Sequence, residues 1–534
     1  MTRFAPKPSG GSVVLPGSSL NAARRARELD ELRAGAVVDV LVVGLGATGA
    51  GAALDAAARG LSVAAVDAHD LAFGTSRWSS KMIHGGLRYL AKGQVGVARE
   101  SAVERDVLLR RTAPHLVRAQ PYLLPLAAGV PRATAVLAGL GYRLGDALRA
   151  AAGTPRRVLP GPVRVSAERA LRLAPALDPA GLRGGLVSWD GRVVDDARLV
   201  VAIARTAAAH GARILTRCRV LELAGDGALV RDERSGETFT VKARAVINAT
   251  GVWAGLLVPS VPLRPSRGTH LVLRPGTLGP LRTAMHVPIP GHVNRFALVL
   301  PQHDGRVHVG LTDDPIDGPV PDVPEVPEKD VTFLLEVLGT VLAEPPRRDQ
   351  VAGAFAGLRP LLAGPGADGG GRAGATADLS RRHAVLRSPD GVHTIVGGKL
   401  TTYRRMAQDV IDAACPDAPP SRTARLPLVG APRGRPAAPA GRPIPRRLTD
   451  LYGEEAAAVL ALAGEDPALA EPVCPEVSPV TGAEVVWAIR HEGAMHSTDL
   501  VDRRTRIGLV PADADAVRPA FQSLLDRYAT DVQG

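Results

Sequence analysis

A glycine-rich turn between a predicted strand and a predicted helix constrains the fold of this chain more than any other feature. The stretch VDVLVVGLGATGAGAALDAAARGLSVAAVDAHD covers residues 38–70 and places Gly44, Gly46 and Gly49 in a G-x-G-x-x-G pattern. The apolar run before the pattern predicts a strand, and the alanine-rich run after it predicts a helix. A second apolar run at residues 63–66 completes a βαβ unit.

Each glycine of this turn has a separate physical role. Gly44 permits the tight turn, Gly46 lets a pyrophosphate approach the backbone, and Gly49 lets the helix pack closely on the strand. Asp67 follows Gly49 by 18 residues, where a carboxylate accepts hydrogen bonds from ribose hydroxyls and disfavours a 2′-phosphate. The context therefore predicts a site for FAD or NAD rather than NADP. The alternative is a glycine turn that only joins strand to helix.

The segments that follow favour FAD over NAD. Both cofactors share the ADP half that the glycine turn contacts, so the motif alone does not separate them. An NAD-binding fold continues with more parallel strands, whereas FGTSRWSSKMIHGGLRYL, residues 73–90, is polar and glycine-rich and predicts a segment wrapped around a flavin. Further on, GGKLTTYRRMAQDVIDAA predicts a helix capped by Thr401 and Thr402, with its N-terminus facing the flavin. An ordinary capped helix is the alternative there.

The rest of the chain divides into distinct regions. The alternating runs THLVLRP, RFALVLP and RVHVGLTD predict inserted antiparallel strands, and two stretches of helical spacing close the chain. The predicted class is α/β, with a Rossmann-like FAD-binding domain, an inserted antiparallel-sheet substrate domain and a C-terminal helical domain. Ordered structure is expected from about Val37, although LNAARRARELDELRAG before it is typical of a short amphipathic helix. The expected boundaries are 1–36 for a basic, partly disordered extension, 37–115, 160–260 and 352–415 for the FAD-binding domain, 116–159 and 261–351 for the substrate domain, 416–447 for a Pro/Arg linker and 448–534 for the helical domain.

Composition excludes several classes of protein. The chain of 534 residues carries a net charge of +12, but its basic residues are scattered among 53 acidic ones, aromatic residues make up 3%, and no nucleic-acid module is visible. Cys218, Cys415 and Cys474 are widely spaced without a zinc-ligand pattern, so we expect neither disulfides nor a metal site. No stretch has the pattern of a signal peptide or of a membrane span. These features predict a cytoplasmic protein without nucleic-acid partners.

Several longer motifs resemble the family of FAD-dependent glycerol-3-phosphate dehydrogenases, respiratory flavoproteins related to glycine and amino-acid oxidases. HGGLRYL and GGKLTTYR are specific to these enzymes. The similar segments run in family order from about residue 37 to 415, and IRHEGAMHSTDLVDRRTRIGL resembles the C-terminal helical domain of the family. They are VVGLGATGAGAALDAAARGLSV, GTSRWSSKMIHGGLRYL, ERDVLLRRTAPHLV, VVDDARLV, INATGVWA, RGTHLVL, VGLTDDP, GLRPLL and VGGKLTTYRRMA. The chain departs from the family at Leu45, where relatives often have glycine, and at Asp67, where many have glutamate.

This resemblance implies oxidation of sn-glycerol 3-phosphate to dihydroxyacetone phosphate by hydride transfer to FAD. A phosphate dianion requires cations, with arginine for bidentate contact and lysine as a point charge. The implied catalytic residues are His270, Arg359 and Lys399. The implied substrate-binding residues are Arg88, Tyr89, Thr312, Arg359, Arg381 and Lys399. The implied FAD-binding residues are Gly44, Gly46, Ala47, Thr48, Gly49, Asp67, Thr75, Ser76, Ser80, His84, Gly85, Gly86, Leu87, Thr250, Gly251, Gly398, Lys399, Leu400, Thr401 and Thr402.

Two of these roles can also be argued from the side chains themselves. Lys399 is one of only six lysines, and Gly397 and Gly398 would keep its backbone close to the flavin. We expect its ammonium group to reach the substrate oxygens in a space that an arginine would overfill; a solvated surface charge is the alternative. The catalytic base stays open between His270, whose imidazole has a suitable pKa near neutrality, and Arg359, which would stabilise the alkoxide.

A pair of adjacent carboxylates has a structural interpretation. Asp195 and Asp196 invite a paired-acid mechanism, but their position before an apolar helical run predicts an N-cap and a first-turn acid of a helix that reaches His210.

The resemblance also implies an electron acceptor and a location. The electrons would pass to a membrane quinone, through peripheral contact with anionic lipid at the inner face of the plasma membrane; homodimerisation stays open. The arginines of the linker and the basic terminal segments are candidates for lipid contact, and a solvated linker is the alternative. A glycerophosphate oxidase that uses oxygen is the rival enzyme. A basic nucleic-acid-binding protein and a non-catalytic flavin-binding protein are rivals of another class.

Overall fold

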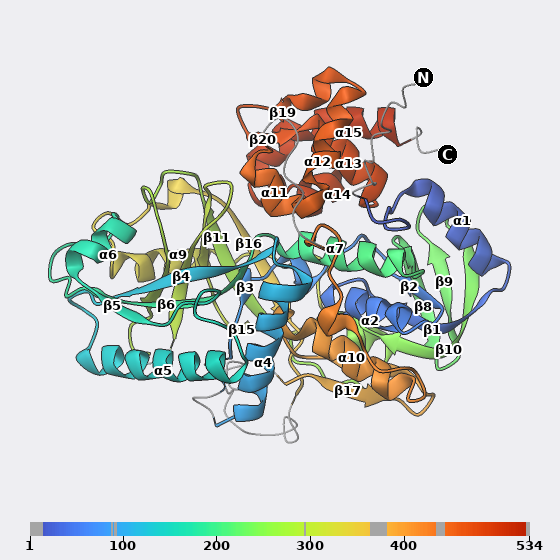
Figure 1. Ribbon diagram of the computed structural model, residues 1–534, viewed down its shortest axis with the longest axis horizontal. Coiled ribbons are helices and arrows are strands. Elements are labelled where there is room, and N and C mark those ends of the chain that lie inside the picture. Colours follow the sequence, from blue (N-terminus) through green and yellow to red (C-terminus); the bar gives the residue numbers. More distant parts are fainter. Residues whose placement is uncertain are drawn as a thin grey trace, which may run out of the picture.

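The computed structural model describes residues 14–86, 89, 93–292, 295–363, 382–433 and 444–529. Two sheets lie side by side, and a cluster of C-terminal helices sits above them (Figure 1). The predicted α/β class, with a Rossmann-like domain, an antiparallel substrate sheet and a C-terminal helical domain, is confirmed. Three predicted site residues, Leu87, Arg88 and Arg381, lie outside the described residues.

The nucleotide-binding sheet is built on the predicted βαβ unit. Strand β1 (Val37–Val43) pairs in parallel with β2 (Val63–Val66) on one side and with β10 (Thr238–Asn248) on the other. Beyond these lie β7 (Arg213–Leu215) and β18 (His393–Val396), also in parallel pairing. Every residue of β2 is buried, as is usual for a parallel strand covered on both faces.

Helices cover one face of this sheet. They are α2 (Ala47–Ala58), α7 (Asp196–Ala209) and α10 (Tyr403–Ala414), and α2 contacts both of the others. The alanines and glycines of α2 allow close packing, since a Cβ at Gly51 would lie 2.9 Å from the Tyr403 ring. The sequence pattern therefore predicts both the helix and its tight contacts.

The opposite face is covered by α1 (Ala22–Arg33) and by the antiparallel strands β8 (Cys218–Ala224) and β9 (Gly227–Asp232). Leu29 and Leu32 of α1 are buried in the same apolar cluster as β1. The amphipathic helix is thus confirmed, but the expectation that ordered structure begins near Val37 is wrong, because α1 completes the cover of the sheet. Strand β17 (Ala384–Arg387) pairs antiparallel with β18 at the sheet edge.

The second sheet has ten strands and is antiparallel except where β12 pairs with β4. Across the sheet they run β15 (Asp314–Pro315), β11 (Ser266–Leu273), β14 (Val307–Gly310), β13 (Phe296–Pro301), β12 (Ala284–Pro288), β4 (Val117–Pro125), β6 (Gly185–Val193) and β3 (Met82–Ile83), with β16 (Val351–Arg359) paired to β11 and β5 (Val163–Val165) paired to β6. The helices of this part are α4 (Val95–Val107), α5 (Arg132–Ala151), α6 (Ala167–Leu173) and α9 (Glu328–Gly339), with α8 (Ala254–Leu257) following β10.

The sheets divide the chain differently from the boundaries expected from the sequence. Strands β5 and β6 lie within residues 160–260, and most of β16 lies within 352–415, yet all three pair in the substrate sheet. The strands of both sheets are short apolar runs in the sequence. Which strand pairs with such a run is decided by long-range contacts rather than by the residues of the run itself. The substrate sheet is therefore assembled from more segments than expected.

The C-terminal domain is helical, as predicted. Its elements are α11 (Arg446–Tyr452), α12 (Ala456–Ala461), α13 (Gly482–His491), α14 (Ser497–Asp499), α15 (Pro511–Tyr528) and a hairpin of β19 (Pro472–Cys474) and β20 (Ser478–Thr481). Trp487 and Phe521 are fully buried in its core.

The first half of the expected linker is packed against the protein. Leu428 and Val429 are buried, and their amides donate hydrogen bonds to the Thr112 carbonyl at 2.9 Å and to the Thr206 hydroxyl at 3.0 Å. Residues 416–433 are therefore not a solvated linker, because their apolar side chains extend the core of the nucleotide-binding domain.

Candidate active site

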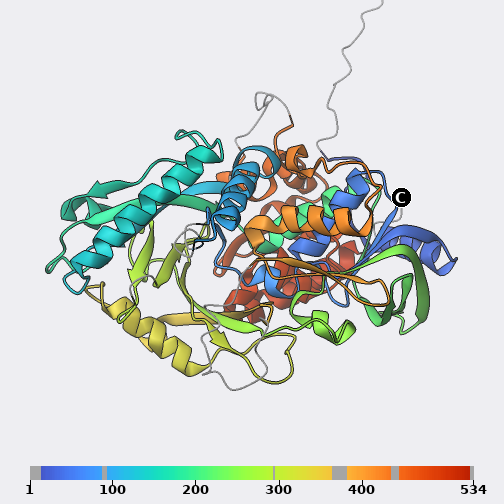
Figure 2. The same ribbon diagram turned by 90° about the horizontal axis from the view of Figure 1, so that it is seen from below.

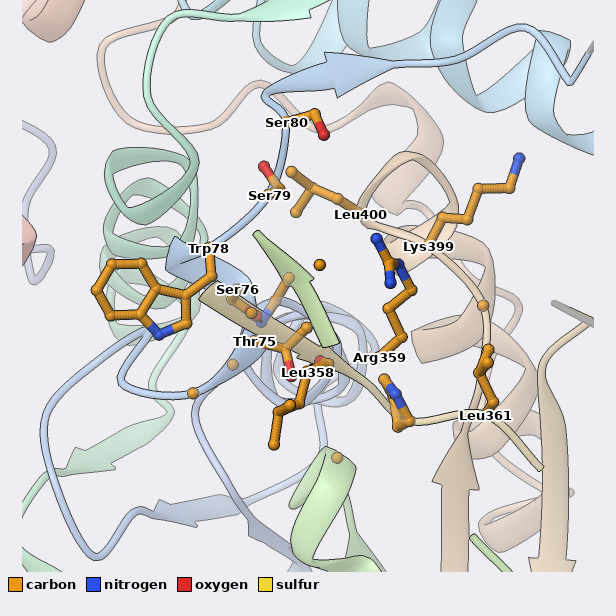
Figure 3. Close-up of a pocket in the computed structure, with 18 of the residues that line it drawn as sticks. Thr75, Ser76, Trp78, Ser79, Ser80, Leu358, Arg359, Leu361, Lys399 and Leu400 are labelled. Carbon is orange, nitrogen blue, oxygen red and sulfur yellow. Dashed lines mark hydrogen bonds between the residues drawn. The ribbon is translucent and has the colours of Figure 1, made fainter. Parts of the chain in front are cut away.

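A cavity of about 1120 Å³ lies between the two sheets. Its walls come from the glycine turn after β1, from residues 73–86, from the ends of β11 and β16, and from the loop before α10 (Figure 3). Ligand pockets commonly enclose ~300–1,000 Å³, so this one can hold a dinucleotide together with a small substrate. Of the predicted FAD-binding residues that the structure describes, all line the cavity except Gly49, Gly85 and Thr402.

The glycine turn has the geometry that its sequence predicts. Gly44 has a φ of +100°, and a Cβ there would lie 2.7 Å from the Ala249 carbonyl oxygen. A Cβ at Gly49 would lie 1.8 Å from the Gly44 carbonyl oxygen. Gly49 therefore works by letting α2 pack on the turn, without facing the cavity. The first amide of the helix, at Ala47, donates to the Ser76 hydroxyl at 2.9 Å, beside the cavity.

Asp67 first stabilises the turn itself. Its carboxylate accepts hydrogen bonds from the amides of Leu45 at 2.7 Å and His69 at 2.8 Å. Burial, only partly offset by these two hydrogen bonds, raises the pKa of Asp67 to about 6. The carboxylate is therefore largely ionised at neutral pH, and it lines the cavity where a ribose would lie after the second strand.

The loop before α10 brings two left-handed glycines to the cavity, but its threonines do not cap the helix. Gly397 and Gly398 have φ values of +80° and +70°. The Thr401 hydroxyl accepts a hydrogen bond from the His84 amide at 3.0 Å, and the Thr402 hydroxyl donates to the Lys399 carbonyl at 3.3 Å. The expected side-chain cap is wrong, because these hydroxyls bind the HGG segment and the loop itself.

His270 is buried in the cavity wall on β11. Its Nε2 lies 2.9 Å from the Ser80 hydroxyl, and its ring stacks on Phe355 with the centroids 4.8 Å apart. Burial lowers the pKa of His270 to about 3, and the charges of Lys81 and Arg359 contribute to the shift. The expectation of a pKa near neutrality is therefore wrong. The imidazole is uncharged at pH 7 and can accept a proton, but as a weak base.

Arg359 ends β16 and reaches over a glycine of the neighbouring strand. Its Nη1 lies 3.0 Å from an Asp313 carboxylate oxygen and 3.2 Å from the Ser266 hydroxyl, and Nη2 donates to the Thr312 carbonyl at 3.1 Å. A Cβ at Gly268 would lie 2.2 Å from Nη2. The glycine thus makes room for the guanidinium group at the cavity wall.

Thr312 borders the cavity, but its hydroxyl group points to the sheet. The hydroxyl accepts from the Thr269 amide at 3.1 Å and donates to the Asp330 carboxylate at 3.2 Å. These bonds hold the loop that carries Asp313, so in this structure Thr312 acts as a support for that loop.

Lys399 extends towards α4 rather than towards Arg359 (Figure 3). Its Nζ donates to the Ser101 hydroxyl at 2.9 Å and lies 4.1 Å from the centroid of the Tyr89 ring. Lys399 and Arg359 line the same cavity, and the expected contact of the Lys399 ammonium group with substrate oxygens beside the flavin stays a prediction.

Comparison with known proteins places the chain in a family. A sequence profile of FAD-dependent oxidoreductases matches residues 39–404, and a profile described as the C-terminal domain of alpha-glycerophosphate oxidase matches residues 421–530. Glycerol-3-phosphate dehydrogenase 1 of Mycobacterium tuberculosis is 50% identical over 522 residues, which cover 96% of this chain and 100% of the relative.

This chain belongs to the family of FAD-dependent glycerol-3-phosphate dehydrogenases. A mitochondrial glycerol-3-phosphate dehydrogenase of Arabidopsis thaliana is 32% identical over 92% of this chain and 83% of its own length. The X-ray structure of the glycerol-3-phosphate dehydrogenase from Bacillus halodurans, complexed with FAD, has a TM-score of 0.69 at 24% identity and covers 95% of this chain and 97% of its own. The likeness of the two structures shows that the fold extends over both main domains and the C-terminal helices.

The donor groups of this family member fit FAD. The glycine turn, Asp67 and Ser76 line the cavity, and so do Ser80 and His270. The first group has the backbone amides and carboxylate that an ADP half requires, and the second leaves polar groups beside the reacting end. Among the described residues, no three His, Cys, Asp or Glu side chains gather as metal ligands would.

Sequence reasoning missed residues of this dehydrogenase that support the site from behind. Asp190 accepts from the Gly85 amide at 3.1 Å and from Arg105 at 2.6 Å, which holds the HGG segment in place. Lys81 lies 3.2 Å from Asp196 directly beside the Ser80–His270 contact. Lysine is scarce in this chain, and that scarcity singled out Lys399; the same signal applied equally to Lys81.

Proposed function

We propose that this protein oxidises sn-glycerol 3-phosphate to dihydroxyacetone phosphate and passes the electrons to a membrane quinone. The observation that carries the proposal is one cavity that joins a dinucleotide cradle to His270 and Arg359. The names of the relatives support the substrate. FAD, when bound, supplies the acceptor for the hydride that leaves C2 of the substrate. The proton of the C2 hydroxyl leaves separately, so the substrate loses two electrons and two hydrogens.

Three side chains of the cavity wall would act in the deprotonation of the C2 hydroxyl. His270 is uncharged at neutral pH, so its imidazole can take the hydroxyl proton. The Arg359 guanidinium stabilises negative charge that develops on the oxygen, which lowers the basicity that the imidazole needs. Ser80, bonded to Nε2, orients the ring.

An exposed apolar face on α5 supports contact with a membrane surface. Val136, Leu137, Leu140 and Leu144 are 70%, 53%, 55% and 45% exposed. At ~100° per residue these four lie within one arc of the helix. Figure 2 shows α5 along the outside of the molecule. Amphipathic helices of this kind bury their apolar face at the headgroup boundary of a bilayer.

Basic side chains flank this face, and the cavity lies behind it. Arg132, Arg143 and Arg157 are exposed on α5 and just after it, where they would meet anionic lipid. On the inner side of the same helix, Tyr142 lines the cavity and its hydroxyl lies 3.0 Å from His286 Nδ1. This single helix therefore separates the reacting cavity from the proposed lipid surface.

The α5 face is a better candidate for lipid contact than Arg422 and Arg447 of the expected linker. Arg422 donates to the Ala58 carbonyl, and Arg447 pairs with Glu484. Both guanidinium groups are therefore engaged within the protein. No helix of the described residues is both long and apolar enough to cross a bilayer. We propose peripheral attachment at the inner face of the plasma membrane.

Anaerobic titration tests the function. Glycerol 3-phosphate should bleach the absorption of the bound flavin, and a short-chain quinone should restore it in the presence of anionic vesicles. Flavin that stays oxidised with excess glycerol 3-phosphate would contradict the substrate.

A glycerophosphate oxidase is the second candidate, because the C-terminal region matches the profile named for such an oxidase. Oxygen uptake separates the two enzymes. Uptake that equals the turnover with glycerol 3-phosphate, with no faster reaction with quinone, would favour the oxidase.

A further inference from the structure

A buried cluster of four charges joins three distant parts of the chain behind the cavity wall. Lys81 follows the segment that lines the cavity, Asp195 and Asp196 begin α7, and Arg506 comes from the C-terminal domain. All four residues are at most 5% exposed. Lys81 Nζ lies 3.2 Å from Asp196, and Arg506 Nε lies 3.2 Å from Asp195.

The two carboxylates do more than start the helix. Asp195 caps α7 by accepting from the Arg198 amide at 2.7 Å, as the sequence predicts. Asp196 instead accepts from the amide of Ser79 at 3.0 Å and from its hydroxyl at 2.7 Å. Asp196 therefore ties α7 to the segment that lines the cavity.

Arg506 holds the same segment from the other side. Its guanidinium donates to the Arg77 carbonyl and lies 5.6 Å from the centroid of the Trp78 ring. Arg506 and Lys81 have φ values of 60° and 56°, a left-handed conformation that is uncommon outside glycine. The surrounding contacts hold both backbones in this conformation.

The segment held in this way carries the hydrogen bond to the catalytic candidate. Trp78, Ser79 and Ser80 line the cavity, and the Ser80 hydroxyl meets His270 Nε2. Arg506 of the C-terminal domain thus contacts the carbonyl of Arg77, three residues before the serine that meets the imidazole.

We propose that Arg506 is a positioning residue for the oxidation step, and that through it the C-terminal domain sets the placement of Ser80 and His270. The two carboxylates and two cations balance each other in charge. Removing Arg506 leaves a buried carboxylate uncompensated and frees the Arg77 carbonyl, so the segment from Arg77 to Lys81 should relax. The proposal goes beyond the assignment of the substrate, and one of its tests needs no substrate.

The holoenzyme tests this with two variants of Arg506 and a control. In Arg506→Met we expect near-normal FAD content and an altered visible circular dichroism of the oxidised flavin. Anaerobic reduction of the flavin by glycerol 3-phosphate should be slower by about tenfold or more, and KM should change by less than about threefold. Arg506→Lys should recover part of the rate, since lysine can pair with Asp195 but does not reach the Arg77 carbonyl as well. Arg527→Met, at an exposed ion pair with Asp466 in the same domain, should change nothing.

A double variant distinguishes two possible roles of Arg506, balancing the buried charge and positioning the segment that carries Ser80. Asp195→Asn keeps a good N-cap while removing a charge, so Asp195→Asn with Arg506→Met should recover thermal stability but not the rate of flavin reduction. Recovery of both would show that Arg506 only balances charge and would overturn the proposal. Full rate and unchanged dichroism in Arg506→Met would overturn it as well. A wild-type flavin that glycerol 3-phosphate does not reduce would instead refute the proposed function, and the dichroism would still test the positioning role.

Discussion

The Ser80 hydroxyl lies 2.9 Å from His270 Nε2, across 190 residues of sequence. Ser80 belongs to the segment after the βαβ unit, and His270 belongs to a strand of the substrate sheet. Both residues line the cavity, and the reacting carbon of the substrate should lie next to their contact.

Replacing His270 should slow the oxidation step. We expect His270→Gln to retain FAD and to reduce its flavin about 100-fold more slowly with glycerol 3-phosphate, since a positioned base commonly contributes that much. Because the pKa of His270 is held at about 3, this group should impose no loss of rate between pH 8 and pH 5. Stopped-flow reduction across this range measures both effects. An intact rate in the variant would contradict the role of His270, and a wild-type acid limb near pH 6.5 that vanishes in the variant would contradict its lowered pKa.

Lys399 should not tolerate arginine. Its ammonium group is held between the Ser101 hydroxyl and the Tyr89 ring, and a wider guanidinium does not fit that contact. We expect Lys399→Arg to bind FAD normally and to lose at least about tenfold in kcat, roughly 1.4 kcal/mol of transition-state stabilisation. The exposed Lys242→Arg is the matched control. Near-normal turnover of Lys399→Arg would remove the lysine from the mechanism.

The apolar face of α5 should govern contact with lipid. Leu137→Ser with Leu140→Ser removes two exposed leucines, each worth roughly 1.5–3 kcal/mol if fully buried in the bilayer interface. Flotation with anionic vesicles should weaken and quinone reduction should fall, while reduction of a soluble dye stays unchanged. Leu221→Ser, an exposed leucine on β8, is the control. Unchanged flotation in the α5 variant would show that another surface meets the membrane.

The folded protein should lose stability as the pH falls from 6.5 towards 4. Burial lowers the pKa of His115 and His270 to about 3 and of His286 to about 4, so the unfolded chain binds more protons in this range. Each of these histidines lowers the free energy of unfolding by up to about 1.4 kcal/mol per pH unit. Asp67 acts in the opposite direction below about pH 6, because its folded pKa is raised.

Urea unfolding at pH 7, 6 and 5 measures this balance. The denaturation midpoint should fall with pH, and His115→Gln should make the fall shallower. A midpoint that rises on acidification would show that these histidines are charged in the folded state.

Local sequence patterns were sufficient for the elements whose causes are local. Three such elements form as their residues predict: the strand, glycine turn and helix at residues 37–58, the N-cap at Asp195, and the amphipathic α1. The required φ angle, cap or apolar face depends in each case on residues only a few positions apart. Most of the predicted site residues that the structure describes line the cavity, since they lie in short motifs placed at the ends of strands.

Sheet membership, protonation and side-chain direction were decided by the tertiary structure. Strand β6 joined the substrate sheet, the pKa of His270 fell through burial, and Lys399 turned to Ser101, each through groups distant in sequence. The sequence by itself determined the βαβ unit, the dinucleotide turn and the set of residues that could form a site. Only the tertiary structure decided that Arg506 of the C-terminal domain lies behind Ser80 and His270, because long-range contacts and low local polarity arise only when the separate segments pack together.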